Sequence, residues 1–302
     1  MKILQFKSGK TLRLGICEGE QVVVLAAALA ALRPDATAEQ MAAVASTFDL
    51  LNAEGGLDLA ADLVSEALAR PDAAHVLPLA SLELGAPITR PEKIIGVGSN
   101  YYDHLEEMGH DVPQIITNFP MYGNALVGTS DPIIIPRNSE MIGWEAELVL
   151  VIGRKARFVE REDAMDYLLG YSCGNEVVVV DHMRADRQLL RGKTQDSHAP
   201  MGPWIVTKDE VGDPSDLNIR LSVNGEEKQN GSTAGMVFDI PTIISFFSQY
   251  FTLRPGDVIF TGTPAGGSIG MKPPQWLKPG DHVEVEIERV GRLVNDCVAE
   301  KV

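Results

Sequence analysis

Two glutamates at the start of an apolar stretch are the first residues with a chemical signature. Glu145 and Glu147 open WEAELVLVIG, residues 144–153, whose β-branched apolar run predicts a buried strand. Side chains two residues apart on a strand point to the same face, so these carboxylates should project together. Adjacent anions need a cation or a proton, and a hard divalent metal would supply the charge. The alternative is two solvated carboxylates, because surface glutamate pairs are common.

A third acid interrupts another apolar stretch. Glu176 lies in GNEVVVV, residues 174–180, where a lone carboxylate is costly to bury unless it is paired or binds a metal. Together with Glu145 and Glu147 it predicts a site for Mg²⁺ or Mn²⁺ with open positions for water. The alternative is that Glu176 faces solvent or pairs with an arginine.

One histidine has a carboxylate at helical spacing. His104 and Glu107 are three residues apart in DHLEEMG, residues 103–109, so a short helix would place them on one face. The carboxylate could orient the imidazole, which could then move a proton to or from water. An exposed pair on a helical turn without any function is the alternative.

Two loops present further polar groups. Lys193 lies among glycines and prolines in RGKTQDSHAPMGPW, residues 191–204, which suggests a fixed loop; an ordinary exposed lysine is the alternative. Thr261, Gly262 and Thr263 follow the predicted strand DVIF. Backbone N–H groups and hydroxyls at such a turn can bind a carboxylate of a substrate, and a plain turn is the alternative.

Composition restricts the class of protein. The chain has 302 residues, a formal net charge of −16 at pH 7 and three cysteines. Nucleic acids and anionic membranes need a basic partner surface, so neither is an expected partner. The cysteines form no CxxC pair, which indicates a reducing compartment. The beginning of the chain, MKILQFKSGK, has no apolar core of a signal peptide, so we predict a cytoplasmic protein.

The pattern along the chain predicts an α+β fold that is mostly β. We expect a small N-terminal α+β lobe with its linker over residues 1–85 and a catalytic domain over residues 86–302. The lobe should begin with three short strands and continue with helices in residues 37–70. The main domain should contain β-hairpins at residues 224–225 and 289–291 and a helix over residues 240–250, with a loop over residues 109–125.

Several segments together resemble the fumarylacetoacetate hydrolase family. GSNYYDHLEEMG is similar to its segment with the histidine and glutamate, and WEAELVLVIGRKAR to its metal-binding strand. GYSCGNEVVVVDHM is similar to the segment of the third metal carboxylate, and RGKTQDSHAPMGPWIV to the loop of the catalytic lysine. RPGDVIFTGTPAG and LKPGDHVEVEIERVGRLVN resemble its closing strands. The matches cover residues 91–302 in the family's order.

The resemblance implies a mixed β-roll or sandwich catalytic domain, a homodimer, bound Mg²⁺ or Mn²⁺ and a small keto-acid substrate. It implies metal-dependent hydrolysis of a carbon–carbon bond in an acylpyruvate or 2,4-diketo acid, similar to fumarylacetoacetate or fumarylpyruvate. The implied residues are Glu145, Glu147 and Glu176 for the metal, His104, Glu107 and Lys193 for catalysis, and Tyr101, Asp196, Thr261, Gly262 and Thr263 for the substrate.

The sequence departs from the family pattern at four positions. Glu176 stands where the family usually has aspartate, and Val180, Met183 and Met121 stand where it usually has arginine, glutamine and lysine. Glutamate is one methylene longer and can still bind a metal. These departures keep open a decarboxylase, isomerase or hydratase of similar keto acids, or a catalytically silent relative.

Overall fold

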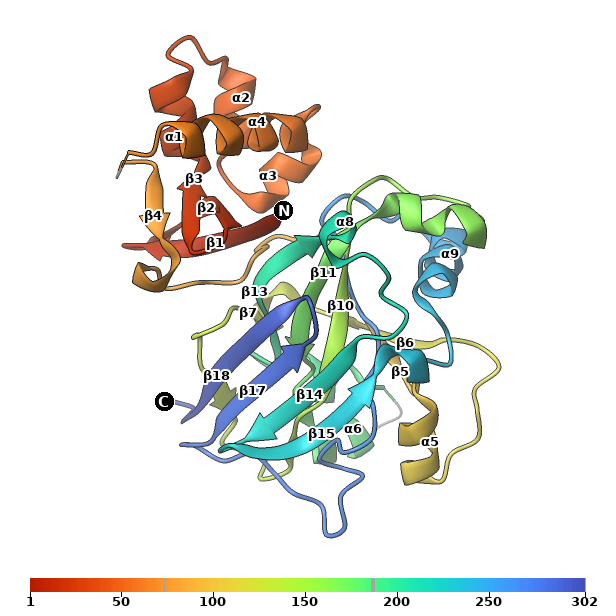
Figure 1. Ribbon diagram of the computed structural model, residues 1–302. Helices are drawn as coiled ribbons and strands as arrows, with labels where there is room; N and C mark the ends of the chain where they lie inside the picture. The colour runs from red at the N-terminus through yellow and green to blue at the C-terminus, as the bar shows by residue number, and fades with distance from the viewer. Residues whose placement is uncertain (73, 186–187, 302) are drawn as a thin grey trace.

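A computed structural model describes residues 1–72, 74–185 and 188–301, which form two large β-sheets with helices around them (Figure 1). The strands are β1 (Lys2–Ser8), β2 (Thr11–Glu18), β3 (Gln21–Val24), β4 (Val76–Pro78), β5 (Ile94–Gly98), β6 (Thr117–Met121), β7 (Leu126–Val127), β8 (Ile133–Ile135), β9 (Ile142–Gly143), β10 (Ala146–Ile152), β11 (Leu168–Asn175), β12 (Val178–Val179), β13 (Ala199–Thr207), β14 (Asn218–Val223), β15 (Glu226–Ser232), β16 (Val258–Phe260), β17 (His282–Ile287) and β18 (Gly291–Ala299). The α-helices are α1 (Leu25–Leu32), α2 (Ala38–Ala43), α3 (Thr47–Asn52), α4 (Gly56–Ala69), α5 (Tyr102–Met108), α6 (Val180–Ala185), α7 (Leu190–Lys193), α8 (Lys208–Val211) and α9 (Ile240–Tyr250).

The larger sheet has β10 near its centre. Its strand order is β4-β3-β2-β1-β13-β11-β10-β16-β5-β6, with β7 paired to β13, and the second sheet has the order β15-β14-β17-β18-β8. Every residue of β10 is buried, because the sheet is covered on both faces. The predicted fold class, α+β and mostly β, is confirmed by this architecture. The full burial of β10 means that acids at its start lie at the edge of the core.

The N-terminal part of the chain joins the larger sheet directly. β1 pairs antiparallel with β13, where Lys2 faces Val206 and Ile3 faces Ile205. Helices α1 to α4 lie together beside β1 to β4, at the top left in Figure 1. The division into residues 1–85 and 86–302 stays a prediction.

Two local predictions need correction, and one helix was not predicted. Residues 109–125 are not all loop, because β6 pairs antiparallel with β5 and buries Phe119 and Met121. The apolar segment 25–32 forms helix α1 after the predicted strand, and its alanines and leucines favour a helix. Residues 199–203, which we assigned to the loop of Lys193, belong to β13.

Both predicted hairpins are present. The turn at Asn224 and Gly225 joins β14 to β15, and both residues have positive φ, 53° and 80°. Asparagine and glycine tolerate this left-handed backbone, which explains the sequence preference. Arg289 belongs to the turn between β17 and β18, and Gly291 is the first residue of β18. No helix in the described part of the chain is long and apolar enough to cross a membrane.

Asp257 ties the start of β5 to the turn before β16. Its side chain is 1% exposed. It accepts the backbone N–H of Lys93 at 3.0 Å and that of Arg254 at 2.8 Å, and it lies 3.0 Å from Lys93 Nζ. Asp257→Ala should lower the free energy of unfolding by about 2–4 kcal/mol, because buried donors lose a charged acceptor. Urea unfolding would measure this, and Glu18→Ala at an exposed position should change it by less than about 0.5 kcal/mol. Equal unfolding midpoints for both variants would contradict the expectation.

His282 should make the stability of the protein depend on pH. Its Nδ1 lies 2.6 Å from Asp296 Oδ1 and its Nε2 lies 3.0 Å from Glu284 Oε1. The hydrogen bond to Asp296, followed by that to Glu284, raises the pKa of His282. Stability from a raised pKa is fully present below the unfolded pKa and is lost as pH rises through the folded pKa.

The measurement is Tm against pH for the parent and for His282→Gln. The variant should show a smaller fall in Tm above about pH 6.5, the ordinary histidine pKa. Because His282 is 42% exposed, high salt should reduce the difference. Identical pH profiles at low salt would show that His282 makes no such contribution.

Candidate active site

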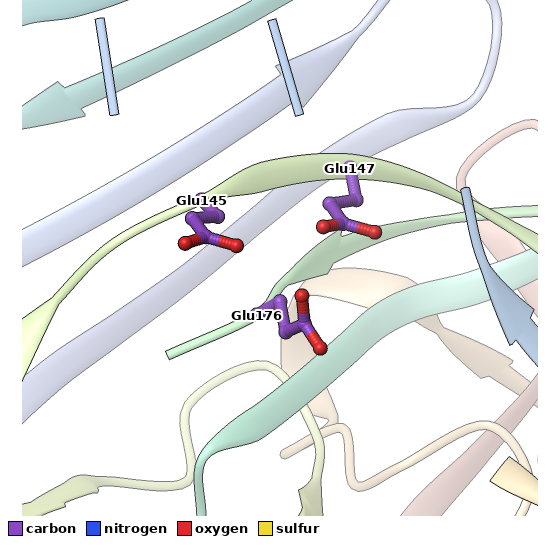
Figure 2. Close-up of side chains that lie close together, drawn as sticks. All are labelled: Glu145, Glu147 and Glu176. Carbon is purple, nitrogen blue, oxygen red and sulfur yellow. The ribbon is translucent and has the colours of Figure 1, made fainter. Parts of the chain in front are cut away.

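The structure brings the three predicted carboxylates together. One side-chain oxygen from each of Glu145, Glu147 and Glu176 lies within 4.8 Å of the others (Figure 2). Glu145 directly precedes β10, Glu147 is its second residue, and Glu176 directly follows β11. The two strands pair with Ala146 opposite Asn175, and the N–H of Glu176 donates to the carbonyl of Glu145 at 2.8 Å. The pairing of β10 with β11 therefore brings the carboxylate of Glu176 next to those of Glu145 and Glu147, about 30 residues earlier in the chain.

Two oxygens of the cluster have no hydrogen-bond partner among the described residues. They are Glu147 Oε1 and Glu176 Oε1, and both side chains are 1% exposed. Burial, together with the charges of Glu176 and Glu145, raises the pKa of Glu147 well above its usual range. Burial also raises the pKa of Glu176 to about 7, although the charge of Lys193 opposes the rise. Unpartnered buried carboxylate oxygens suit a hard divalent cation.

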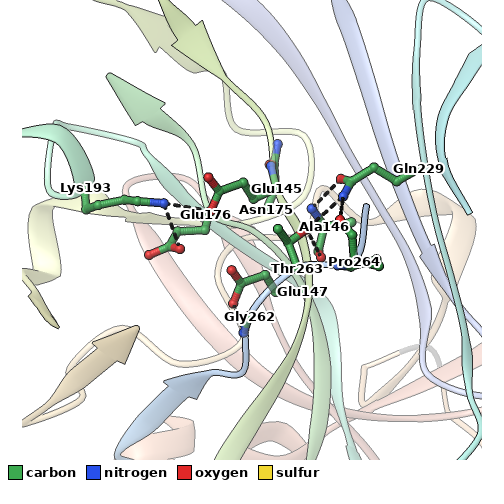
Figure 3. A network of polar contacts seen from close by, with 10 residues as sticks. All are labelled: Glu145, Ala146, Glu147, Asn175, Glu176, Lys193, Gln229, Gly262, Thr263 and Pro264. Atoms are coloured by element: carbon green, nitrogen blue, oxygen red, sulfur yellow. Dashed lines mark hydrogen bonds and ion pairs between the residues drawn. The ribbon is translucent and has the colours of Figure 1, made fainter. Parts of the chain in front are cut away.

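Lys193, the last residue of α7, is a buried cation in the cluster. Its Nζ donates to Glu145 Oε2 at 2.7 Å and to Glu176 Oε2 at 3.0 Å (Figure 3). Burial lowers the pKa of Lys193, but the charges of Glu145 and Glu176 raise it above its ordinary value. The ammonium of Lys193 is charged and is bound by two carboxylates. The alternative from the sequence analysis, an ordinary exposed lysine, is therefore excluded.

The turn after β16 holds Glu147. The backbone N–H of Gly262 donates to Glu147 Oε2 at 2.8 Å. Gly262 has φ 97°, and a Cβ there would lie 2.8 Å from the Cβ of Asn100, so glycine is required. Asn100 in turn donates to the carbonyl of Thr261 at 2.7 Å. The segment that leads into α5 thus packs on the turn that orients Glu147.

The predicted pair of His104 and Glu107 forms on α5. His104 Nδ1 lies 3.0 Å from Glu107 Oε2, and Glu107 Oε1 accepts the N–H of Gly266 at 3.1 Å. A Cβ at Gly270 would lie 2.1 Å from the Glu107 carboxylate. A Cβ at Gly267 would lie 3.9 Å from His104 Cε1 and 3.7 Å from the carbonyl oxygen of Trp144. The imidazole of His104 and the carbonyl group of Trp144 therefore both lie near Gly267.

The residues predicted to bind substrate lie in different surroundings. Thr261 donates to the carbonyl of Leu148 at 2.8 Å and Thr263 to that of Ala146 at 2.8 Å, so both hydroxyls hold β10. Tyr101 is fully buried. Asp196 is exposed and accepts a hydrogen bond from Asn124 Nδ2 at 2.7 Å. The substrate contacts of these residues stay predictions.

The positions that depart from the family pattern are also placed. Val180 is fully buried at the start of α6, and Met183 lies on the same helix beside Gly192. Met121 is buried at the end of β6. Asn175 and Gln229 were not predicted, yet both touch the cluster's backbone, Asn175 by accepting the N–H of Glu145 at 3.1 Å. For Asn175 the only sequence signal was its position next to Glu176, and no sequence pattern pointed to Gln229.

Comparisons with known proteins agree with these features. A model of the fumarylacetoacetate (FAA) hydrolase C-terminal family matches residues 93–298. A mitochondrial oxaloacetate tautomerase of Xenopus laevis is 45% identical over 226 residues, 74% of this chain and 71% of that protein. The structure of a fumarylacetoacetate hydrolase from Exiguobacterium antarcticum has a TM-score of 0.80 and 32% identity, covering 99% of this chain and 100% of the other. That of a maleylpyruvate hydrolase from Sphingobium sp. SYK-6, in complex with manganese(II) and pyruvate, has a TM-score of 0.78 and 30% identity over 100% of both chains.

The prediction of a cytoplasmic protein is wrong by the same comparison. Similar tautomerases from Xenopus laevis, Bos taurus and Homo sapiens are all named as mitochondrial. Sparse cysteines argue against an oxidising compartment, but they do not distinguish one reducing compartment from another.

The family assignment rests on agreement between order, coverage and geometry. The matching region, residues 93–298, contains all the predicted metal and catalytic residues. The three acids, Lys193 and the pair of His104 and Glu107 lie on the segments that carried the resemblance. The chain therefore belongs to the fumarylacetoacetate hydrolase family.

Proposed function

We propose that the chain is a divalent-metal-dependent tautomerase that interconverts the keto and enol forms of a short 2-oxo diacid such as oxaloacetate. The observation that carries the proposal is the cluster of three acids with two unpartnered buried oxygens, closed on one side by the cation Lys193. The similarity to the Xenopus laevis tautomerase supports this reaction over others in the family.

The all-oxygen cluster would hold the metal. Glu145, Glu147 and Glu176 would bind Mg²⁺ or Mn²⁺, and when bound the cation would supply Lewis-acid polarisation of the 2-oxo group. Manganese in the related maleylpyruvate hydrolase supports a divalent ion of this kind. Lys193 would stabilise negative charge that develops on the substrate oxygen, as a fixed buried cation can.

The reaction itself moves protons. Enolisation takes one proton from C3 of the substrate and places one on the 2-oxo oxygen, and ketonisation reverses both transfers. His104 would accept and return the proton at C3 through Nε2, because Glu107 occupies Nδ1 at 3.0 Å. Glu107, held by Gly266, would keep the ring in place. This assignment requires no carbon–carbon bond to break.

A second candidate is hydrolysis of a carbon–carbon bond in an acylpyruvate or 2,4-diketo acid. In that reaction His104 and Glu107 would activate a water that attacks the distal carbonyl. The similarity to a maleylpyruvate hydrolase favours it specifically. A decarboxylase would use the same cluster without attacking water and would release CO₂.

The discriminating experiment follows both the rate and the products. The parent chain with Mn²⁺ or Mg²⁺ is mixed with enol-oxaloacetate and, separately, with acylpyruvates, and loss of enol absorbance is recorded against a blank with metal alone. Faster decay with all four carbons of oxaloacetate retained supports the tautomerase. Pyruvate and a second acid from an acylpyruvate support the hydrolase, and CO₂ supports a decarboxylase. A rate no higher than the blank on every substrate would overturn all three and favour a silent relative.

We also infer that the chain forms a homodimer. β15 and β8 are the edge strands of the second sheet, and β6 ends the larger one. Exposed sheet edges pair readily with other chains unless they are covered. Light scattering at micromolar concentration should give about twice the chain mass of 32.7 kDa. A mass of one chain under these conditions would count against the dimer.

A further inference from the structure

Gln229 on β15 has a buried side-chain amide next to the cluster of three glutamates, and the proposed chemistry gives this amide no role. Its side chain is 1% exposed, although it lies in the polar strand segment EEKQNGS. Figure 3 shows its amide directed at Ala146, Thr263 and Pro264. Burying an amide is unfavourable unless its donors and acceptor are all used. The hydrogen bonds of Gln229 therefore indicate its structural role.

The three partners of the amide fix which of its atoms is the oxygen and which is the nitrogen. Oε1 accepts the N–H of Ala146 at 2.8 Å, and Nε2 donates to the carbonyl of Pro264 and to Thr263 Oγ1, both at 2.8 Å. A backbone N–H can only donate and a carbonyl can only accept, so the orientation of the amide is fixed. Gln229 uses both donors and its acceptor on two separate segments.

The first segment is the start of β10. Ala146 stands between Glu145 and Glu147, and its carbonyl accepts the hydroxyl of Thr263 at 2.8 Å. The pairing of β10 with β16 reaches only to Val149. Gln229 and Thr263 therefore satisfy the two backbone groups of Ala146 beyond the end of the pairing with β16. The backbone between two proposed ligands is held by side chains.

The second segment is the loop that positions Glu107. Pro264, bound by Gln229, is two residues before Gly266, which donates to Glu107. Gly266 packs on β15 so closely that a Cβ would lie 2.1 Å from the carbonyl oxygen of Lys228. The loop is thus seated on the strand of Gln229 and tied to it by the amide.

We propose that Gln229 is a positioning residue that holds the ligand strand and the loop of Glu107 in one arrangement, so that loss of its amide weakens metal binding. The inference rests on the proposed function only in taking Glu145 and Glu147 as metal ligands. Groups that orient metal ligands from outside typically change metal affinity or activity by about 10–100-fold when they are removed.

The test measures Mn²⁺ affinity by titration calorimetry, without any substrate. Gln229→Met keeps the length of the side chain and removes its hydrogen bonds, and Gln229→Glu keeps the shape but has no donor when ionised. Both should bind Mn²⁺ about 10–100-fold more weakly than the parent. Asn295→Leu is the matched control, because Asn295 is 2% exposed and donates to the carbonyls of Gly128 and Asp131 away from the cluster. Its affinity should stay within about twofold of the parent, since remote sites couple weakly.

A double mutant separates positioning from general loss of stability. Thr263→Val removes the other side-chain hydrogen bond to Ala146, so the two substitutions should disturb the same segment. The loss of Mn²⁺ affinity in the double mutant Gln229→Met with Thr263→Val should therefore be smaller than the product of the two single fold-losses. Parent-like affinity in Gln229→Met, an equal loss in Asn295→Leu, or fully multiplicative losses would each overturn the inference. A parent that binds Mn²⁺ but does not tautomerise oxaloacetate would refute the proposed function alone. A parent that binds no Mn²⁺ would overturn both.

Discussion

Glu147→Ala should lose Mn²⁺ affinity by more than about 100-fold, beyond the range for residues outside the ligand set. Glu147 is as deeply buried as Glu176, and one of its oxygens accepts the N–H of Gly262 while the other has no partner among the described residues. A metal that binds there gains a ligand that no described residue competes for. Calorimetric titration of the parent and the variant with Mn²⁺ would measure the loss, and the proposed tautomerase activity should fall with it.

The control must exclude unfolding as the cause. Glu147→Gln keeps the shape of the side chain and an oxygen that can accept the N–H of Gly262, yet it removes the charge, so it should fold and still bind Mn²⁺ poorly. Glu162→Ala at an exposed position should bind as the parent does. If folded Glu147→Ala and Glu147→Gln both bind Mn²⁺ as tightly as the parent, the metal assignment is wrong.

His104→Ala should lower turnover by about 10²–10⁴, the usual contribution of a general acid or base. Its affinity for Mn²⁺ should stay nearly unchanged, because His104 bonds to Glu107 and is not one of the three clustered acids. Initial rates at saturating Mn²⁺ and calorimetry on the same preparation would separate the two quantities. Full turnover in this variant would remove His104 from the mechanism.

Glu107→Gln tests whether the carboxylate acts through the imidazole. An amide can still occupy the space between His104 and Gly266 but carries no charge to stabilise a protonated ring. Turnover should fall while the thermal unfolding midpoint stays close to that of the parent. A variant that loses Mn²⁺ binding instead would mean that this pair belongs to the metal site.

Local spacing was enough to identify much of the candidate site. Glu145 and Glu147 share a face because a strand repeats every two residues, and His104 and Glu107 meet at 3.0 Å because a helical turn brings every third residue near. Glu176 was visible as a charge in an apolar run. Each of these signals lies within a few residues of sequence. The resemblance to the family, whose segments occur in the same order, showed that the separate signals belong to one site.

Contacts between distant segments were not predictable in the same way. Gln229 lies 83 residues from Ala146 along the chain, inside a polar strand whose composition suggests only a solvated edge. Helix α1 follows three valines without a break in apolar character, so periodicity did not separate it from β3. β6 was hidden by Pro120 and by neighbouring glycines, although its pairing with β5 buries Phe119.

The contact of Lys193 with Glu145 and Glu176 has a consequence for how the proposed metal ion would be loaded. An ammonium that already compensates part of the acidic charge lets the chain fold with the site assembled, before any metal arrives. Loading of the proposed metal would then be binding to a preformed site and not a folding step. The ion found in the purified protein should follow the supply of Mg²⁺ and Mn²⁺ in its surroundings, and dialysis against one of them should replace the other without refolding.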